Sequence, residues 1–145
     1  MKFRNWEIIA DKKYNDEIYS NLKGGIADGC QCNDCRNFVK NRQDIFPQEI
    51  KTLLAELGID YTKEADNIHL QKLKNGLHSY LALFHFRGEI TKLEDETGLL
   101  PLNDNLIINF GLPDGQILFP NVERLVQIEF YIEMPWTIEK ELESD

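Results

Sequence analysis

The spacing of apolar residues changes from a helical to a strand-like period near the middle of the chain. In residues 46–59, FPQEIKTLLAELGI, four apolar side chains recur at i, i+3, i+4 and i+7, the spacing of one helix face: Ile50, Leu53, Leu54 and Leu57. Pro47 suits the first turn of a helix, and Gly58 suits the left-handed position that follows the last turn. The pattern predicts a helix whose apolar face packs on a core.

From Asn67 onward the period is two. The segment NIHLQKL, residues 67–73, alternates, and the dipeptide Asn75-Gly76 separates it from the apolar segment LHSYLALFHFRG, residues 77–88. Asn-Gly favours the type I′ turn of a β-hairpin. Since the second arm is apolar at odd and even positions, we expect a central strand that is covered on both faces.

A two-residue Asn75-Gly76 loop sets the expected register of this hairpin. It places three pairs opposite one another: Leu73 and His78, His69 and Ala82, and Asp66 and His85. His69 and His78 would then share one face of the sheet, about 13 Å apart, while His85 would lie on the other face. On this register one ion cannot bind both His69 and His78.

Other elements are expected before the hairpin. Residues 5–11, NWEIIAD, predict a first strand, and Glu17–Leu22 predict a weaker second one. Residues 33–42 predict a short helix that is capped by Asn33 or Asp34, because either side chain can accept hydrogen bonds from open N–H groups.

Strand patterns continue to the end of the chain. The segments LIINFGL and QILF, residues 106–112 and 116–119, flank the turn signal PDG and predict a second hairpin. Apolar and polar residues alternate again in residues 124–136. We therefore expect a single α+β domain, residues 1–145, with a mainly antiparallel β-sheet, two short helices inserted after the first strands, and an acidic frayed end at about 139–145.

Composition limits the classes of partner. The chain has 145 residues and a net charge of −9, so its field repels nucleic acid and anionic membrane surfaces and leaves room for a basic protein partner. No run approaches the roughly 20 apolar residues of a membrane helix. The charged start MKFRNWEIIADKK does not resemble an export signal, and we expect a cytoplasmic protein.

The candidate chemistry lies in DGCQCNDCRNF, residues 28–38, where all three cysteines fall within six residues: Cys30, Cys32 and Cys35. A C-x-C-x-x-C spacing lets sulfurs converge on a zinc ion. Cysteines three apart before a helix can also be activated thiols, although no βαβ unit of the thioredoxin type precedes them. The third reading is that the three cysteines are simply structural, buried or capping.

A structural zinc site needs a fourth ligand from elsewhere in the chain. The preferred candidate is His85, with His78 as the alternative; His69, Asp28 and Asp34 are further possibilities. Each histidine taken alone also has a simpler reading, as a hydrogen-bonded structural ring. No G-x-S-x-G, P-loop, H-E-x-x-H or Rossmann glycine pattern is present, so no known catalytic motif identifies an enzyme.

Several segments together resemble a family of bacterial proteins whose activity is uncharacterised. They are CQCNDCRNF, FPQEIKTLLAELGID, KEAD, GLHSYLALFHFRGEI and MPW, and they extend from Cys30 to Trp136. The resemblance implies a self-contained bacterial domain, and it implies no activity, cofactor or catalytic residue. The chain departs from the family pattern in LALFHF, where Gly and Trp are expected before F-H-F.

Three functions are compatible with these observations. The first is a small binding or interaction module whose cysteine loop is held by a structural metal or by packing. The second is an enzyme that uses an activated thiolate or a Cys–His metal centre. The third is an acidic immunity-type protein that masks a basic partner. The first is the preferred hypothesis, because the sequence contains no recognisable catalytic constellation.

Overall fold

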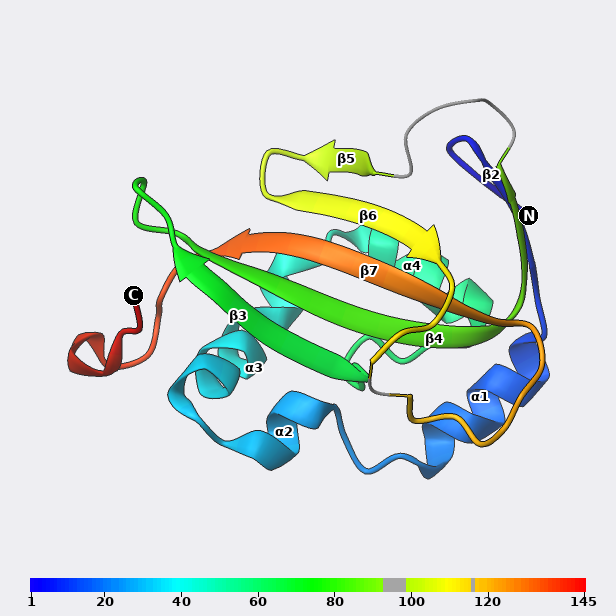
Figure 1. Cartoon of the computed structure of the whole chain (residues 1–145), viewed down its shortest axis with the longest axis horizontal. Helices are drawn as coiled ribbons and strands as arrows, with labels where there is room; N and C mark the ends of the chain where they lie inside the picture. The colour runs from blue at the N-terminus through cyan, green and yellow to red at the C-terminus, as the bar shows by residue number, and fades with distance from the viewer. Residues whose placement is uncertain (93–98, 116) are drawn as a thin grey trace.

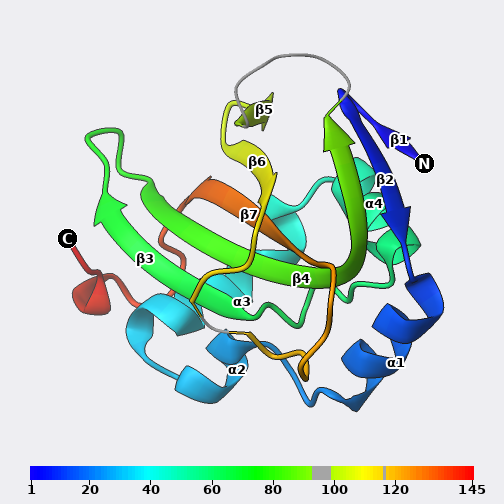
Figure 2. The same ribbon diagram turned by 45° about the vertical axis from the view of Figure 1, so that its right-hand side comes forward.

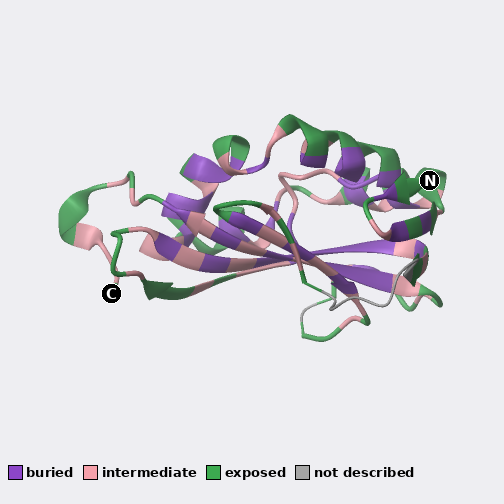
Figure 3. Ribbon diagram, turned by 90° about the horizontal axis from the view of Figure 1, so that it is seen from above, coloured by how far each residue is buried: buried purple, intermediate pink, exposed green. Residues whose placement is uncertain are grey.

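A seven-stranded antiparallel sheet forms the body of the protein, and helices pack against one of its faces (Figures 1 and 3). The computed structural model describes residues 1–92, 99–115 and 117–145. Its elements are β1 (Lys2–Phe3), β2 (Trp6–Ala10), α1 (Lys12–Asn21), α2 (Ile26–Cys30), α3 (Asn33–Ile45), α4 (Gln48–Leu57), β3 (Asp66–Lys72), β4 (His78–Lys92), β5 (Leu100–Asn103), β6 (Leu106–Gly111), β7 (Leu125–Met134) and the 3₁₀ helix η1 (Lys140–Leu142). This architecture confirms the α+β prediction.

Strand β4 organises the sheet. The strand order is β1-β2-β4-β7-β6-β5, and β3 pairs with β4 as well. The first half of β4 lies between β3 and β7, and its second half turns upward to pair with β2 (Figure 2). At Gly88 the backbones of β4 and β2 come so close that a Cβ would lie 2.2 Å from the carbonyl oxygen of Ile9. Glycine allows this crossing because it has no side chain.

The core lies between this sheet and helices α3 and α4. The helical stripe predicted in residues 46–59 is buried, and so are the alternate residues of β7: Ile50, Leu53, Leu54, Leu57, Val126, Ile128, Phe130 and Ile132. Phe46, at the start of α4, contacts the rings of Phe84 and Phe130 across the layers, with centroids 6.1 and 5.1 Å apart. Edge-to-face aromatic contacts of this kind add to the burial of apolar area.

Two predicted elements are wrong. Glu17–Leu22 belongs to helix α1, because Asp11 caps that helix and its buried residues Asn15 and Tyr19 recur at i and i+4. The expected hairpin around PDG does not form either. Strand β6 pairs with β5 and β7, and residues 117–119 form no strand, while residue 116 lies outside the described residues.

The β3–β4 hairpin forms, but its register differs from the prediction. Lys72, rather than Leu73, faces His78, and a bulge between His69 and Gln71 shifts the rest of β3. His69 therefore pairs with Tyr80 and not with Ala82. An inserted residue in one strand shifts every later pair by one position. Strand β3 contains no glycine that would mark the bulge in the sequence.

The acidic C-terminal segment lies against the sheet. Glu143 accepts hydrogen bonds from the side chains of Lys72 and His78, and the hydroxyl of Ser144 donates to Asp34 at 2.6 Å. These contacts anchor a stretch that the sequence suggests is solvated.

Candidate metal centre

The three cysteines converge where α2 ends and α3 begins. Cys30 is the last residue of α2, Gln31 takes a left-handed conformation with φ 60°, and Cys32 caps α3. This reversal turns the chain back on itself within two residues. As a result, the sulfur atoms of Cys30, Cys32 and Cys35 all lie within 4.8 Å of one another.

Cys32 is the N-cap of α3, so the predicted caps Asn33 and Asp34 are its first helical residues. The Sγ of Cys32 accepts a hydrogen bond from the backbone N–H of Cys35 at 3.4 Å. A sulfur in this position lies at the positive end of the helix dipole.

The spacing of the sulfurs fits a thiolate metal site. Tetrahedral zinc with Zn–S bonds of about 2.3 Å holds its sulfurs about 3.8 Å apart, so adjustments of about an ångström would bring these three into a coordination shell. Cys35 is buried, whereas Cys30 and Cys32 are exposed. The cluster is therefore closed toward the core and open toward solvent.

The three thiols differ in acidity. A hydrogen bond from the backbone N–H of Cys32 lowers the pKa of Cys30, and hydrogen bonds with the thiols of Cys32 and Cys35 lower it further. Burial raises the pKa of Cys35 to about 12, and hydrogen bonding with the neighbouring thiols contributes in the same direction. Without a metal, Cys30 therefore loses its proton more readily than Cys35.

An ion cluster that is buried at Arg42 and Glu64 and exposed at Asp28 holds α2 in place. Arg42 donates to Asp28 at 3.1 Å and to the fully buried Glu64 at 2.9 Å, and Asp28 also accepts from the backbone N–H of Gly25 at 2.7 Å. The predicted ligand candidate Asp28 is thus engaged with Arg42 and is not part of the sulfur cluster. Its role is to fix the helix that carries Cys30.

Helix α3 is anchored to the sheet on the other side of the cluster. The Sγ of Cys35 accepts a hydrogen bond from the side-chain amide of Asn67 on β3, at 3.6 Å. The hydroxyl of Tyr80 donates to the backbone oxygen of Asp34 at 2.9 Å, and Asn37 donates to the same hydroxyl at 3.4 Å. These hydrogen bonds hold Cys35 and the start of α3 against β3 and β4.

The structure places His85, the preferred fourth ligand, away from the cysteines. Even-numbered residues of β4 such as Tyr80 and Phe84 face the helices, so His85 faces the opposite side of the sheet. There its Nε2 lies 2.9 Å from Oε1 of Gln127. The expected partner of His85, Asp66, pairs with Leu83 instead.

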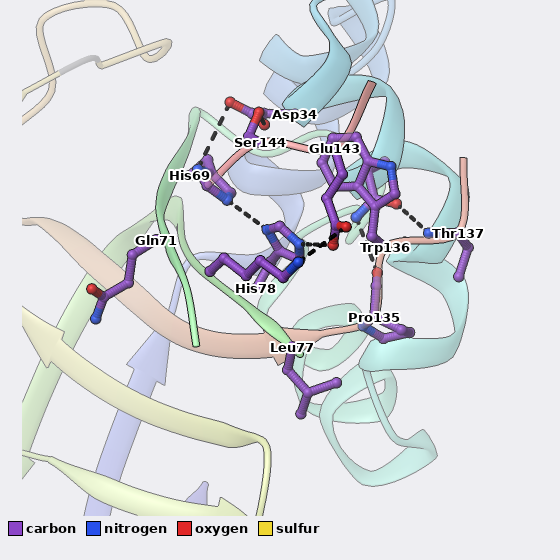
Figure 4. A network of polar contacts seen from close by, with 12 residues as sticks. Asp34, His69, Gln71, Leu77, His78, Pro135, Trp136, Thr137, Glu143 and Ser144 are labelled. Atoms are coloured by element: carbon purple, nitrogen blue, oxygen red, sulfur yellow. Dashed lines mark hydrogen bonds and ion pairs between the residues drawn. The ribbon is translucent and has the colours of Figure 1, made fainter. Parts of the chain in front are cut away.

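His78, the alternative ligand, lies on the helix side but belongs to a different network (Figure 4). Its Nδ1 lies 2.9 Å from Nε2 of His69, and its Nε2 lies 2.7 Å from a carboxylate oxygen of Glu143. The expected 13 Å separation of His69 and His78 is therefore wrong. The bulge in β3 places His69 diagonally beside His78, where their side chains meet.

Asp34 links this network to the cysteine helix. One of its carboxylate oxygens lies 3.8 Å from Nδ1 of His69, and the other accepts the hydroxyl of Ser144. Asp34 and both histidines are thus close to the cluster in the fold, but within the described residues the group with metal-binding spacing contains only the three cysteines. Sequence reasoning missed Glu143 and Ser144, and no motif in the C-terminal segment marks them.

Within the described residues, no helix has the length and apolar character needed to cross a membrane. Comparisons with family models, with curated proteins and with solved structures gave no match. The resemblance to a bacterial family stays a prediction. The geometry at Cys30, Cys32 and Cys35 is therefore the observation on which a function can be built.

Proposed function

We propose that the protein is a small binding module in which Cys30, Cys32 and Cys35 hold a zinc ion that fastens α2 to α3. The convergence of their three sulfur atoms within 4.8 Å carries this proposal. Thiolates are soft ligands, which favour zinc over hard ions such as magnesium and calcium. The ion would neutralise the negative charge of the three thiolates, which would otherwise repel one another at such short range.

The role of the metal is structural in this proposal. Helix α2 has only five residues, and the reversal at Gln31 is exposed, so the loop gains order from a crosslink. The chain supplies three of the four ligands of a structural site, so an external ligand would complete it beside the exposed Cys30 and Cys32. In the described part of the chain, neither a histidine nor a carboxylate joins the three sulfurs.

The test is zinc binding by the reduced, tag-free full-length protein, measured by competition with a chromophoric chelator. We expect about one equivalent of zinc, and Cys32→Ser should weaken binding by about 100-fold or more, since a direct ligand is lost. Gln31→Asn is the matched control: it changes the residue between two ligands, tolerates the left-handed conformation and should bind zinc as well as the parent protein. Less than about a tenth of an equivalent with three reduced thiols would refute the proposal.

An enzyme that uses Cys30 as a nucleophile is the second candidate. It is favoured by the exposure of this thiol and by its lowered pKa, since the thiolate is the reactive form. Alkylation of the protein as purified from cells separates the two candidates. A structural zinc ion should protect Cys30 from alkylation, whereas a catalytic thiol should stay reactive.

A further inference from the structure

The face of the sheet that points away from α3 and α4 carries a row of apolar side chains. The cross-strand register aligns Ile68 of β3, Leu81 of β4, Tyr131 of β7 and Ile107 of β6 in one line across four strands. None of the four is buried, and Ile68 is 40% exposed. Apolar side chains that form one contiguous exposed row are typical of a binding surface.

A hollow opens beside this row. It has a volume of ≈ 200 Å³, and its lining includes Leu70, Ile107 and Tyr131 together with the acidic residues Asp104 and Glu133. Leu70 is the bulged residue of β3 and is 49% exposed. The hollow is smaller than the roughly 300–1,000 Å³ of a typical small-molecule site, so it suits a single side chain of a partner.

Carboxylates flank the apolar row on both sides. Glu129 and Glu133 lie two residues before and after Tyr131 on β7, on the same face and about 7 Å away along the strand. The hydrogen-bond partners of Glu129 are polar and uncharged: Asn109, Gln127 and Tyr131. Burial, followed by the charge of Glu129, raises the pKa of Tyr131, in keeping with a negative field at this face. In residues 1–92, 99–115 and 117–145, no lysine or arginine forms an ion pair with Glu129, Glu133 or Asp104.

We propose that this face, defined by Ile68, Leu81, Ile107, Glu129, Tyr131 and Glu133, binds a basic protein. The partner would place an apolar side chain in the hollow and lysine or arginine side chains against the two glutamates. An extended segment with basic and apolar residues at alternate positions of one face, as in Lys-x-Leu-x-Lys, has the matching spacing, because side chains on one face recur every 7 Å or so.

Charge decides between the possible occupants. A second copy of this chain would bring the same glutamates face to face in a two-fold pair, and each copy carries a net charge of −9. Nucleic acid is repelled by the same field. A cationic partner is attracted by each carboxylate of this face that has no ion-pair partner, and the net negative charge of the protein increases its association rate.

The inference rests on the proposal of a binding module but not on the zinc ion. Its test uses the full-length protein and a ten-residue peptide in which lysine and leucine alternate at every second position, with serine between them, so that one face carries both residue types. A leucine–glutamate peptide, in which glutamate replaces lysine, is the counterpart. Binding is followed by the amide chemical shifts of the labelled protein at low and high salt. We expect shifts in β3, β4, β6 and β7 from the lysine peptide alone, and weaker binding at high salt.

Two charge-removal variants complete the experiment. Glu129→Gln/Glu133→Gln should weaken binding by about tenfold or more, because both flanking charges are lost. Glu17→Gln/Glu56→Gln removes the same charge from exposed sites on α1 and α4 and should leave affinity unchanged. Equal loss in both variants, binding of the leucine–glutamate peptide, shifts on the helix side, no binding, or self-association through this face would each overturn the inference. Zinc binding is measured separately, so a failure here leaves the metal proposal standing.

Discussion

The imidazole of His69 lies against that of His78, with Nε2 of the first 2.9 Å from Nδ1 of the second. This pair connects the cysteine helix to the C-terminal segment, because Asp34 of α3 lies beside His69 and Glu143 accepts from His78 (Figure 4). Hydrogen bonds from His78 and Lys72 lower the pKa of Glu143, which therefore stays ionised at neutral pH. This carboxylate and the hydrogen bond from Ser144 to Asp34 hold the end of the segment that follows Trp136.

Replacing Glu143 by Ala should release the C-terminal segment from the sheet. Amide protection in residues 137–145 should fall by about tenfold, since charge-assisted hydrogen bonds to two partners are lost, while protection in β4 should remain. Glu141→Ala removes the same charge from an exposed residue two positions earlier and should have no effect. Hydrogen exchange followed by NMR gives the measurement. Unchanged protection in the Glu143 variant would show that the segment is held by other contacts.

Two glycines of the loop that carries Cys30 should respond in opposite ways to alanine. At Gly25 an added Cβ would lie 1.5 Å from a carboxylate oxygen of the buried Glu64, so Gly25→Ala should cost about 1–3 kcal/mol of stability. At Gly29, inside α2, no atom lies within 4 Å of the added Cβ, and Gly29→Ala should stabilise the fold by about 0.4–1 kcal/mol. Urea unfolding of both variants makes the comparison, and equal effects would contradict the described packing around Glu64.

Removal of Arg42 should make stability depend more strongly on pH. Arg42→Met leaves Glu64 buried without its cation and should cost about 3–5 kcal/mol at pH 8. Burial raises the pKa of Glu64 from 4.5 to about 7 even beside Arg42. Between these values the folded state holds a proton that the unfolded state has released, so stability falls as the pH rises.

The loss in Arg42→Met should therefore shrink between pH 8 and pH 5, where Glu64 can take up a proton. Arg36→Met breaks an exposed, solvent-screened ion pair with Glu139 and should leave stability close to that of the parent protein at either pH. Denaturant unfolding at the two pH values tests both variants. A loss in the Arg42 variant that is the same at pH 5 and pH 8 would argue that Glu64 stays ionised.

The three thiols of the reduced, metal-free protein should react with iodoacetamide in a fixed order. Cys30 should be alkylated first near pH 7, because it is exposed and its pKa is lowered. Cys35 should react last, because it is buried and its pKa is raised to about 12. Peptide mass spectrometry identifies the sites, and protein unfolded in urea, where all three should react alike, is the control. Early modification of Cys35 would contradict its burial between α3 and β3.

Periodicity was sufficient to predict the elements whose burial pattern is simple. The stripe in α4 and the alternation in β7 follow from the requirement that each element bury one face, so the sequence predicts both. Helix α1 was missed because its polar residue Asn15 is buried: its side chain donates to the backbone oxygens of Leu57 and Arg87. The hydropathy of the sequence cannot show that a polar side chain is buried by hydrogen bonds to a distant backbone.

The candidate site was predicted in part for a similar reason. The spacing of Cys30, Cys32 and Cys35 is local, and local geometry brings their sulfurs together. The position of a histidine relative to them depends on strand register, and the bulge after His69 alters that register by one residue. Tertiary packing, and not the cysteine motif, places His85 on the far side of the sheet.

The coordination shell of zinc in the loaded protein gives the decisive measurement. X-ray absorption at the zinc edge of reduced full-length protein with one equivalent of zinc should show three sulfur neighbours at about 2.3 Å and one lighter oxygen or nitrogen neighbour. That result would assign the sulfurs of Cys30, Cys32 and Cys35 to one ion whose fourth ligand is not a cysteine. A shell of nitrogen and oxygen with fewer than three sulfurs would contradict the proposed centre.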